Sequence, residues 1–303
     1  MWRRISPALV LVLLAPFIGE VLLGNTHSPI GYLFELPMYG GGALLVREVT
    51  RRTGRGWPTI LLLGVAYGLV EEGLGDLTLW SPKWMGMRLL DYGHLGIGWP
   101  WWMHVLTLHA VFSIGVSVAV TEALFARRGS GPWLGRVGLT VTVVLFVLGT
   151  AGVNQAGLWG YTLRWWQVGV TVALTAVFVV AAFLVPRRRG AATDTAAVPG
   201  VLPVALLGLV PASVFLLVYR LTPGTLDVPA VVPIAVHVVL MAVVVALVGR
   251  WSRRAAWTGT HRFALAAGAA LAYAWYGFLL TGYTPQYELG QALYALIGIG
   301  VLV

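Results

Sequence analysis

The stretch from Trp57 to Trp80, WPTILLLGVAYGLVEEGLGDLTLW, constrains the fold of this chain more than any other. It is apolar and long enough to cross a bilayer, for which about 20 residues suffice. It nevertheless contains Glu71, Glu72 and Asp76. Carboxylates in the hydrocarbon layer are costly, so a chain that keeps three of them must supply partners, protons or water. The polar residues on neighbouring apolar segments therefore decide what this stretch does.

Composition places the whole chain in a membrane. Of its 303 residues, 58% are hydrophobic and only 10% are charged, whereas a soluble domain has about 25% charged residues. This leaves no room for a soluble catalytic domain, and we predict one all-α, polytopic membrane domain over residues 1–303. The absence of cysteine excludes disulfides, a thiolate nucleophile and thiolate metal sites.

The net charge of +9 is explained by topology. Basic residues gather in every second loop, sixteen on one side of the predicted membrane and four on the other. By the positive-inside rule, the N-terminus and the basic loops are predicted to be cytoplasmic in a cell-membrane protein, so nucleic acid is not an expected partner. The basic groups are Arg3–Arg4, Arg47 with Arg51–Arg55, Arg127–Arg136, Arg187–Arg189 and Arg250–Arg262; the opposite loops hold Lys83, Arg88, Arg164 and Arg220.

Hydropathy predicts about ten membrane-spanning helices. A linker at about 187–200 separates a half that carries most polar residues (1–186) from a more apolar half (201–303). The predicted spans are about Ile5–Gly24, Ile30–Val49, Trp57–Trp80, Pro100–Phe125, Val137–Trp159, Trp166–Pro186, Val201–Tyr219, Pro229–Gly249, Phe263–Gly282 and Gln286–Val303.

The deep polar residues of these spans share one depth. A helix rises about 1.5 Å per residue, and on this measure they fall in the outer half of the membrane. They are Glu20, Glu35, Glu71, Glu72, Asp76, His104, His109, Asn154 and His237. We expect them to line an outward-facing polar cavity. Arg47, Glu48 and Glu122 instead lie near the inner interface, where long side chains can snorkel. Trp80, Trp84, Trp99, Trp101 and Trp102 are expected at the outer interface.

Helix periodicity predicts which acids of the third span share a helix face. Glu72 and Asp76 are four residues apart and share a face, while Glu71 lies beside Tyr67, whose hydroxyl could bond to it. Carboxylates crowded in a low dielectric do not all ionise, so at least one is expected to hold a proton. Such a group suits a general acid or base, or a carrier of a transported proton. Alternatively, the acids pair with buried donors such as His104 and only fix the helix register.

His104 and His109 are the candidate electrophiles or metal ligands of the fourth span. They are five residues apart, about 140° around an α-helix, and do not form the HExxH zinc motif. Opposite the carboxylates, they could hold a divalent metal together with Glu72. Each alone could equally be a structural histidine, and a structural role is favoured for His237.

The adjacent glutamates Glu71 and Glu72, then His104, then Asn154 on successive helices resemble the CAAX-processing and bacteriocin-processing (Abi-type) intramembrane protease family. That family carries Glu-Glu-x-x-x-Arg, Phe-x-x-x-His and His-x-x-x-Asn. This chain departs from the pattern at Asp76, Pro100 and Thr150, which replace Arg, Phe and His, and the likeness covers about Trp57 to Trp159. The resemblance implies that one glutamate activates water, with His104 and Asn154 stabilising the oxyanion of a substrate that enters from the membrane.

Three hypotheses follow for the function. The first is a hydrolase or transferase acting on a peptide or lipid-linked substrate. The second is a proton- or ion-coupled transporter that uses the same carboxylates. The third is a membrane binding or assembly protein whose buried acids are structural.

Overall fold

The computed structural model describes residues 6–26, 28–83, 96–129, 131–155, 160–187, 194–221, 228–280 and 285–302. The chain is 79% helical, and the described residues form no strand, which confirms the predicted all-α membrane bundle of about ten helices. Several residues named above lie outside these ranges: Arg3, Arg4, Trp84, Arg88, Trp159, Arg188 and Arg189.

Six described helices are long and apolar enough to cross a membrane, counting α5 to α6 as one. Several spans are not uniform α-helices but contain a wider π-helical segment, labelled η. In chain order the elements are α1 (Pro7–Pro16), η2 (Phe17–Val21), α2 (Pro29–Glu35), η3 (Leu36–Gly40), α3 (Gly41–Arg52), α4 (Trp57–Val70), η4 (Glu71–Gly75), α5 (Trp99–Leu108), η5 (His109–Val116), α6 (Ser117–Leu124), α7 (Arg136–Gln155), α8 (Trp165–Leu184), α9 (Val201–Leu221), α10 (Val231–Trp251), α11 (Gly259–Leu280) and α12 (Pro285–Leu302).

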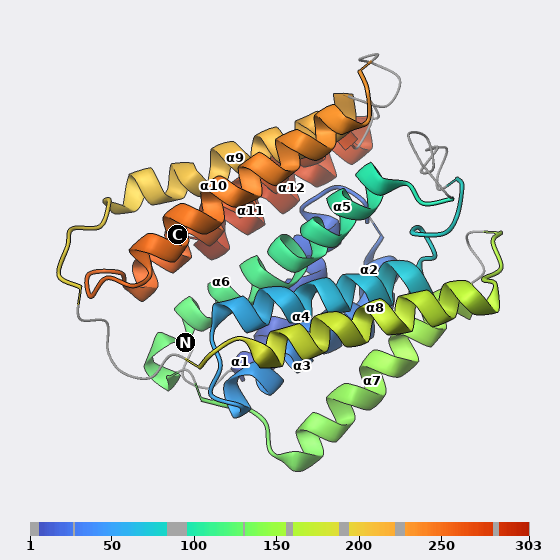
Figure 1. Cartoon of the computed structure of the whole chain (residues 1–303), viewed down its shortest axis with the longest axis horizontal. Coiled ribbons are helices and arrows are strands. Elements are labelled where there is room, and N and C mark those ends of the chain that lie inside the picture. Colours follow the sequence, from blue (N-terminus) through green and yellow to red (C-terminus); the bar gives the residue numbers. More distant parts are fainter. Residues whose placement is uncertain are drawn as a thin grey trace.

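The helices form two groups joined by the continuous span α5–η5–α6 (Figure 1). Helices α9 to α12 lie side by side on one side of this span, and α1 to α4, α7 and α8 lie on the other (Figure 1). The tightest pairing is between α9 and α11. There a Cβ added at Gly208 would meet the backbone oxygen of Leu265, and one added at Gly268 would meet that of Ala205. Glycine therefore allows the two backbones to touch, as is common between membrane helices.

A buried ion-pair network joins the ends of α3 and α6. Arg47 and Glu48 are fully buried, with Arg47 Nη1 2.7 Å from Glu48 Oε1. Glu122 accepts from Arg47 Nε at 3.2 Å and from Arg51 Nε and Nη2 at 2.8 and 2.7 Å. The Arg47 guanidinium also stacks 3.4 Å above the ring of Trp133. The prediction that these residues snorkel to the interface is therefore wrong for Arg47 and Glu48, whose side chains are buried and paired with each other inside the protein.

The third span ends earlier than predicted. The helix stops at Gly75, and Leu77 has a φ of 62°, so the chain turns instead of continuing to Trp80. Glycine at positions 73 and 75 weakens the helix at this point. As a result Trp80, Trp101 and Trp102 pack into a buried apolar cluster and do not face the membrane–water interface as predicted, whereas Trp99 is exposed.

Candidate functional site

Four π-helical segments bring the polar residues of the first four spans together. Proline precedes or lies within η2 and η3, and glycines lie within η4 and η5. Both residue types weaken regular α turns. The π-helix is rare and is frequently found at functional sites. These segments carry Glu20 in η2, Tyr39 in η3, Glu71 and Glu72 in η4, and His109 and Ser113 in η5.

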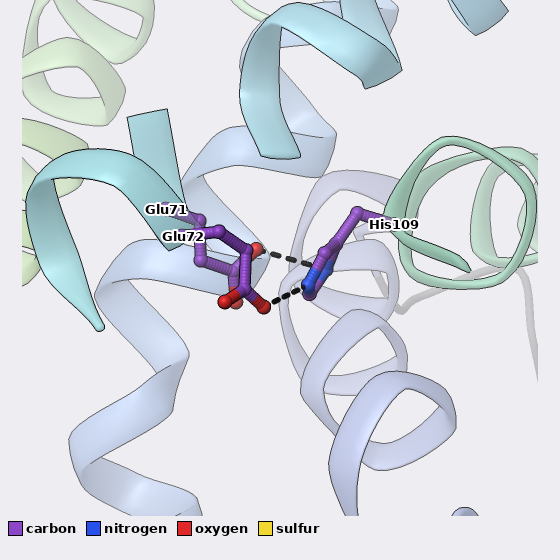
Figure 2. A group of neighbouring side chains, drawn as sticks. All are labelled: Glu71, Glu72 and His109. Atoms are coloured by element: carbon purple, nitrogen blue, oxygen red, sulfur yellow. Dashed lines mark hydrogen bonds and ion pairs between the residues drawn. The ribbon is translucent and has the colours of Figure 1, made fainter. Parts of the chain in front are cut away.

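His109 faces the two adjacent glutamates, with one ring nitrogen directed toward each carboxylate (Figure 2). Its Nε2 is 2.6 Å from Glu72 Oε1, and its Nδ1 is 2.9 Å from Glu71 Oε2. All three side chains are buried, with exposed fractions of 0% for Glu71, 5% for Glu72 and 1% for His109. Instead of an open outward-facing cavity at this point, the structure has a closed cluster.

The two glutamates differ in how they are held. Glu72 Oε2 accepts a hydrogen bond from Thr78, whose hydroxyl oxygen in turn accepts from Trp101 Nε1 at 3.0 Å. By contrast, Glu71 Oε2 lies 2.9 Å from His109 Nδ1, and the same nitrogen lies 3.1 Å from Ser113 Oγ. Glu72 is therefore held by both His109 and Thr78, whereas Glu71 contacts a His109 nitrogen that it shares with Ser113.

Two tyrosines enclose the histidine. The ring centroids of Tyr39 and Tyr67 each lie 6.0 Å from that of His109. Tyr39 donates a hydrogen bond to Glu20 Oε1 at 2.5 Å, which links a third acid to the cluster. The hydroxyl of Tyr67 is buried and, among the described residues, has no hydrogen-bond partner. The bond predicted between Tyr67 and Glu71 stays a prediction, although the two groups interact electrostatically.

The remaining acids and Asn154 lie around this cluster in different roles. Glu35 accepts a hydrogen bond from Thr26, and the half-buried Asp76 follows the end of η4, with its backbone N–H bonded to Glu71 O at 2.8 Å. Asn154 Nδ2 donates to the backbone oxygen of Leu74 at 2.9 Å. Asn154 therefore supports the turn that holds the glutamates, and its amide is already engaged.

His104 is not brought together with the carboxylates. Its ring is stacked between Phe215 and Tyr219 of α9, with centroid distances of 4.5 and 4.2 Å. Its Nδ1 is 3.4 Å from Nε2 of His237, and His237 Nδ1 bonds to Pro233 O at 2.6 Å. His104 and His237 thus form a separate pair that connects α5 to the helices of the second group.

The cluster has the composition of a proton-exchanging or metal-binding site. Glu71, Glu72 and His109 each offer a ligand atom, and these atoms lie within 4.8 Å of one another. A histidine with two carboxylates is a ligand set that zinc accepts. Of the predicted metal ligands, Glu72 and His109 belong to this group and His104 does not. The same groups can share a proton between imidazole and carboxylate.

Three residues of the cluster were not predicted: Tyr39, Thr78 and Ser113. Tyr39 lies four residues after Glu35 and Ser113 four after His109, so helical spacing could have indicated both. The position of Thr78 depends on the turn at Leu77, for which the sequence gives no signal.

A model of an uncharacterized membrane protein family matches residues 9–158, the part of the chain that carries all four π-helical segments. No curated protein and no solved structure matches the chain. The family match supports a multi-pass membrane protein and does not support the resemblance to the CAAX-processing proteases.

Proposed function

We propose that this protein is an intramembrane hydrolase or transferase whose reacting groups are Glu71, Glu72 and His109, acting on a peptide or lipid-linked substrate. The observation that carries the proposal is the buried His109 imidazole held between two carboxylates, within π-helical segments of two different spans. A Glu-Glu pair on one helix opposite a histidine on the next resembles the pattern of the CAAX-type proteases, with His109 and not His104 as the histidine.

The hydrogen bonds suggest a role for each residue. Glu71 contacts a His109 nitrogen that also contacts Ser113, whereas Glu72 is held by both His109 and Thr78, and the less restrained Glu71 is our candidate general base. In hydrolysis it would take a proton from water as the water oxygen bonds to the substrate carbonyl or phosphoryl centre, and would return the proton to the leaving group as the old bond breaks. Glu72 lies 2.6 Å from His109 Nε2, so this contact would hold the imidazole in place beside Glu71 and let the ring exchange a proton with the carboxylates.

A labelling experiment tests this proposal without knowledge of the substrate. Proteoliposomes made from the purified protein and a native membrane extract are incubated in H₂¹⁸O, and the products are read by mass spectrometry. We expect ¹⁸O-labelled products with wild type and with His104→Ala, and none with Glu71→Gln. Equal labelling by wild type and Glu71→Gln would reject Glu71 as the base. A transferase gives no label but changes the lipid or peptide profile in the same Glu71-dependent manner.

The second candidate is a proton- or ion-coupled transporter. Two polar regions that close the bundle at different levels favour this candidate. The glutamate–histidine cluster is buried, and the Arg47–Glu48–Glu122 network joins α3 and α6 nearer the other end of the spans. Transport requires that access alternate between two sides. Since the chain has no native cysteine, Asn25→Cys gives a single probe beside Glu20 and Glu35. If the protein is a transporter, the reactivity of this cysteine should change with pH, and Glu72→Gln should remove this change.

The third hypothesis, a binding or assembly protein, predicts a different pattern. There, Glu71→Gln, Glu72→Gln and His109→Ala would lower the melting temperature and change nothing else. Elemental analysis of the purified protein would find no bound metal.

A further inference from the structure

A groove lies at the end of α10, far along the chain from the glutamate–histidine cluster. It has a volume of about 640 Å³, and its lining combines three arginines with apolar residues and one acid: Arg250, Arg253, Arg254, Val245, Ala246, Gly249 and Asp194. It therefore joins a positively charged surface to an apolar one.

Asp194 also lines the groove and connects it to the segment before α9. This residue pairs with Arg254 through a β-bridge, and its backbone oxygen accepts from Ala255 N at 2.8 Å. The guanidinium of Arg254 donates to Ala197 O and lies 3.7 Å from the Asp194 carboxylate. Arg254 therefore links the Asp194 segment to the end of α10. Its positive charge offsets the negative charge of Asp194, which also lines the groove.

Arg250 and Arg253 are left for a ligand. Both are exposed, and neither side chain has a hydrogen bond or ion pair within the described part of the chain. Two exposed guanidinium groups three residues apart suit a phosphate group, which arginine can bind through paired N–H bonds.

The apolar residues of the groove, Val245, Ala246 and Gly249 (here called the apolar wall), indicate that a phosphate bound by the arginines is part of a lipid headgroup. Helix α10 is the most apolar of the six long spans, and little of it is buried within the protein. Val245 is 65% exposed, and a Cβ added at Gly249 would meet no atom within 4 Å. An acyl chain can therefore lie along α10 while its headgroup reaches the arginines, as basic pockets at membrane surfaces do with anionic lipids.

We propose that this groove binds one anionic phospholipid, with its phosphate on Arg250 and Arg253 and an acyl chain on Val245 and Ala246. Free phosphate would use the same arginines but would gain nothing from the apolar wall. The lipid site is independent of the chemistry at Glu71 and His109, so the two can fail separately.

Native mass spectrometry of the full-length protein tests the site. The protein in detergent is titrated with phosphatidylglycerol or with phosphatidylcholine of the same acyl chains. We expect a tighter first binding event for phosphatidylglycerol. Since one basic residue near a membrane surface contributes about fivefold in lipid binding, Arg250→Gln and Arg253→Gln should each weaken it by about that factor. Arg136→Gln, an exposed arginine at the start of α7 that does not line the groove, should leave it unchanged.

A second variant separates lipid from phosphate. Gly249→Leu fills the apolar side without changing charge, and should weaken phosphatidylglycerol binding while the thermal stability in the presence of inorganic phosphate stays as in wild type. Equal binding of the two lipids, or a phosphatidylglycerol preference that survives in Arg250→Gln/Arg253→Gln, overturns the proposal. Stabilisation by inorganic phosphate together with unchanged lipid binding in Gly249→Leu would assign the groove to free phosphate.

Discussion

His109 and Glu72 come from different spans and meet at 2.6 Å between Nε2 and Oε1, with both side chains buried. Removing one partner of a buried ion pair leaves the other charge without compensation, which typically costs about 3–5 kcal/mol. We therefore predict that His109→Ala lowers the free energy of unfolding by about 3–5 kcal/mol, measured for the detergent-purified protein.

The double variant shows whether this loss comes from the pair. In His109→Ala/Glu72→Gln the carboxylate that lost its partner is neutral, so the double variant should be more stable than His109→Ala alone. Contacting residues show such non-additivity, whereas independent sites add. If the two losses simply add, His109 and Glu72 do not stabilise each other.

His104 provides a matched comparison five residues away on the same span. Its ring is stacked between Phe215 and Tyr219, so its contribution is aromatic packing. We predict that His104→Ala costs about 3 kcal/mol, in the range of other buried aromatic truncations. His104→Phe should restore most of the loss because the stacking is kept, whereas His109→Phe should be as harmful as His109→Ala. Thermal unfolding of the four variants in one detergent makes this comparison. Equal rescue by phenylalanine at both positions would mean that His109 is also a packing residue.

The membrane-spanning helices could be predicted from the sequence because the hydropathy pattern directly shows where each long apolar stretch begins and ends. The predicted helix Val201–Tyr219 is observed as α9 at Val201–Leu221, and the predicted helix Gln286–Val303 as α12 at Pro285–Leu302. Glu20, Glu71 and His109 were predicted to share one depth in the membrane, and in the structure His109 contacts Glu71 while Tyr39 links Glu20 to the same cluster.

The choice between the two histidines could not be made from the sequence. With uniform α turns, one wide cavity can contact both His104 and His109. In the structure a π-helical segment begins at His109, and His104 is held by aromatic rings of α9 that lie more than a hundred residues later. Neither the extra residue in a turn nor such a distant packing partner leaves a local pattern in the sequence.

Arg47 gives a further prediction, because its side chain is more deeply buried than those of the neighbouring arginines. It is fully buried against Glu48 and Trp133, whereas the side chain of Arg52 is 29% exposed and lies 3.6 Å from the same glutamate. We predict that Arg47→Met destabilises the protein by about 3–5 kcal/mol. Arg52→Met should cost about 1 kcal/mol or less, as exposed ion pairs do. Chemical or thermal unfolding of both variants gives the values, and similar losses would show that the Arg47 pair is no stronger than an exposed one.

The contact between α9 and α11 gives a prediction about glycine. A Cβ at Gly208 or Gly268 would collide with a backbone oxygen of the facing helix, and backbone cannot move aside as a side chain can. We predict that Gly208→Ala and Gly268→Ala each destabilise the protein by about 1–3 kcal/mol, the usual range for overpacking. Gly169→Ala on α8 is the control because nothing lies within 4 Å of an added Cβ there, and alanine favours the helix by up to about 1 kcal/mol. Melting temperatures of the three variants in the same detergent should therefore fall for Gly208→Ala and Gly268→Ala and hold or rise for Gly169→Ala. If all three behave alike, helix propensity and not backbone contact governs these positions, and α9 and α11 are not packed as closely as described.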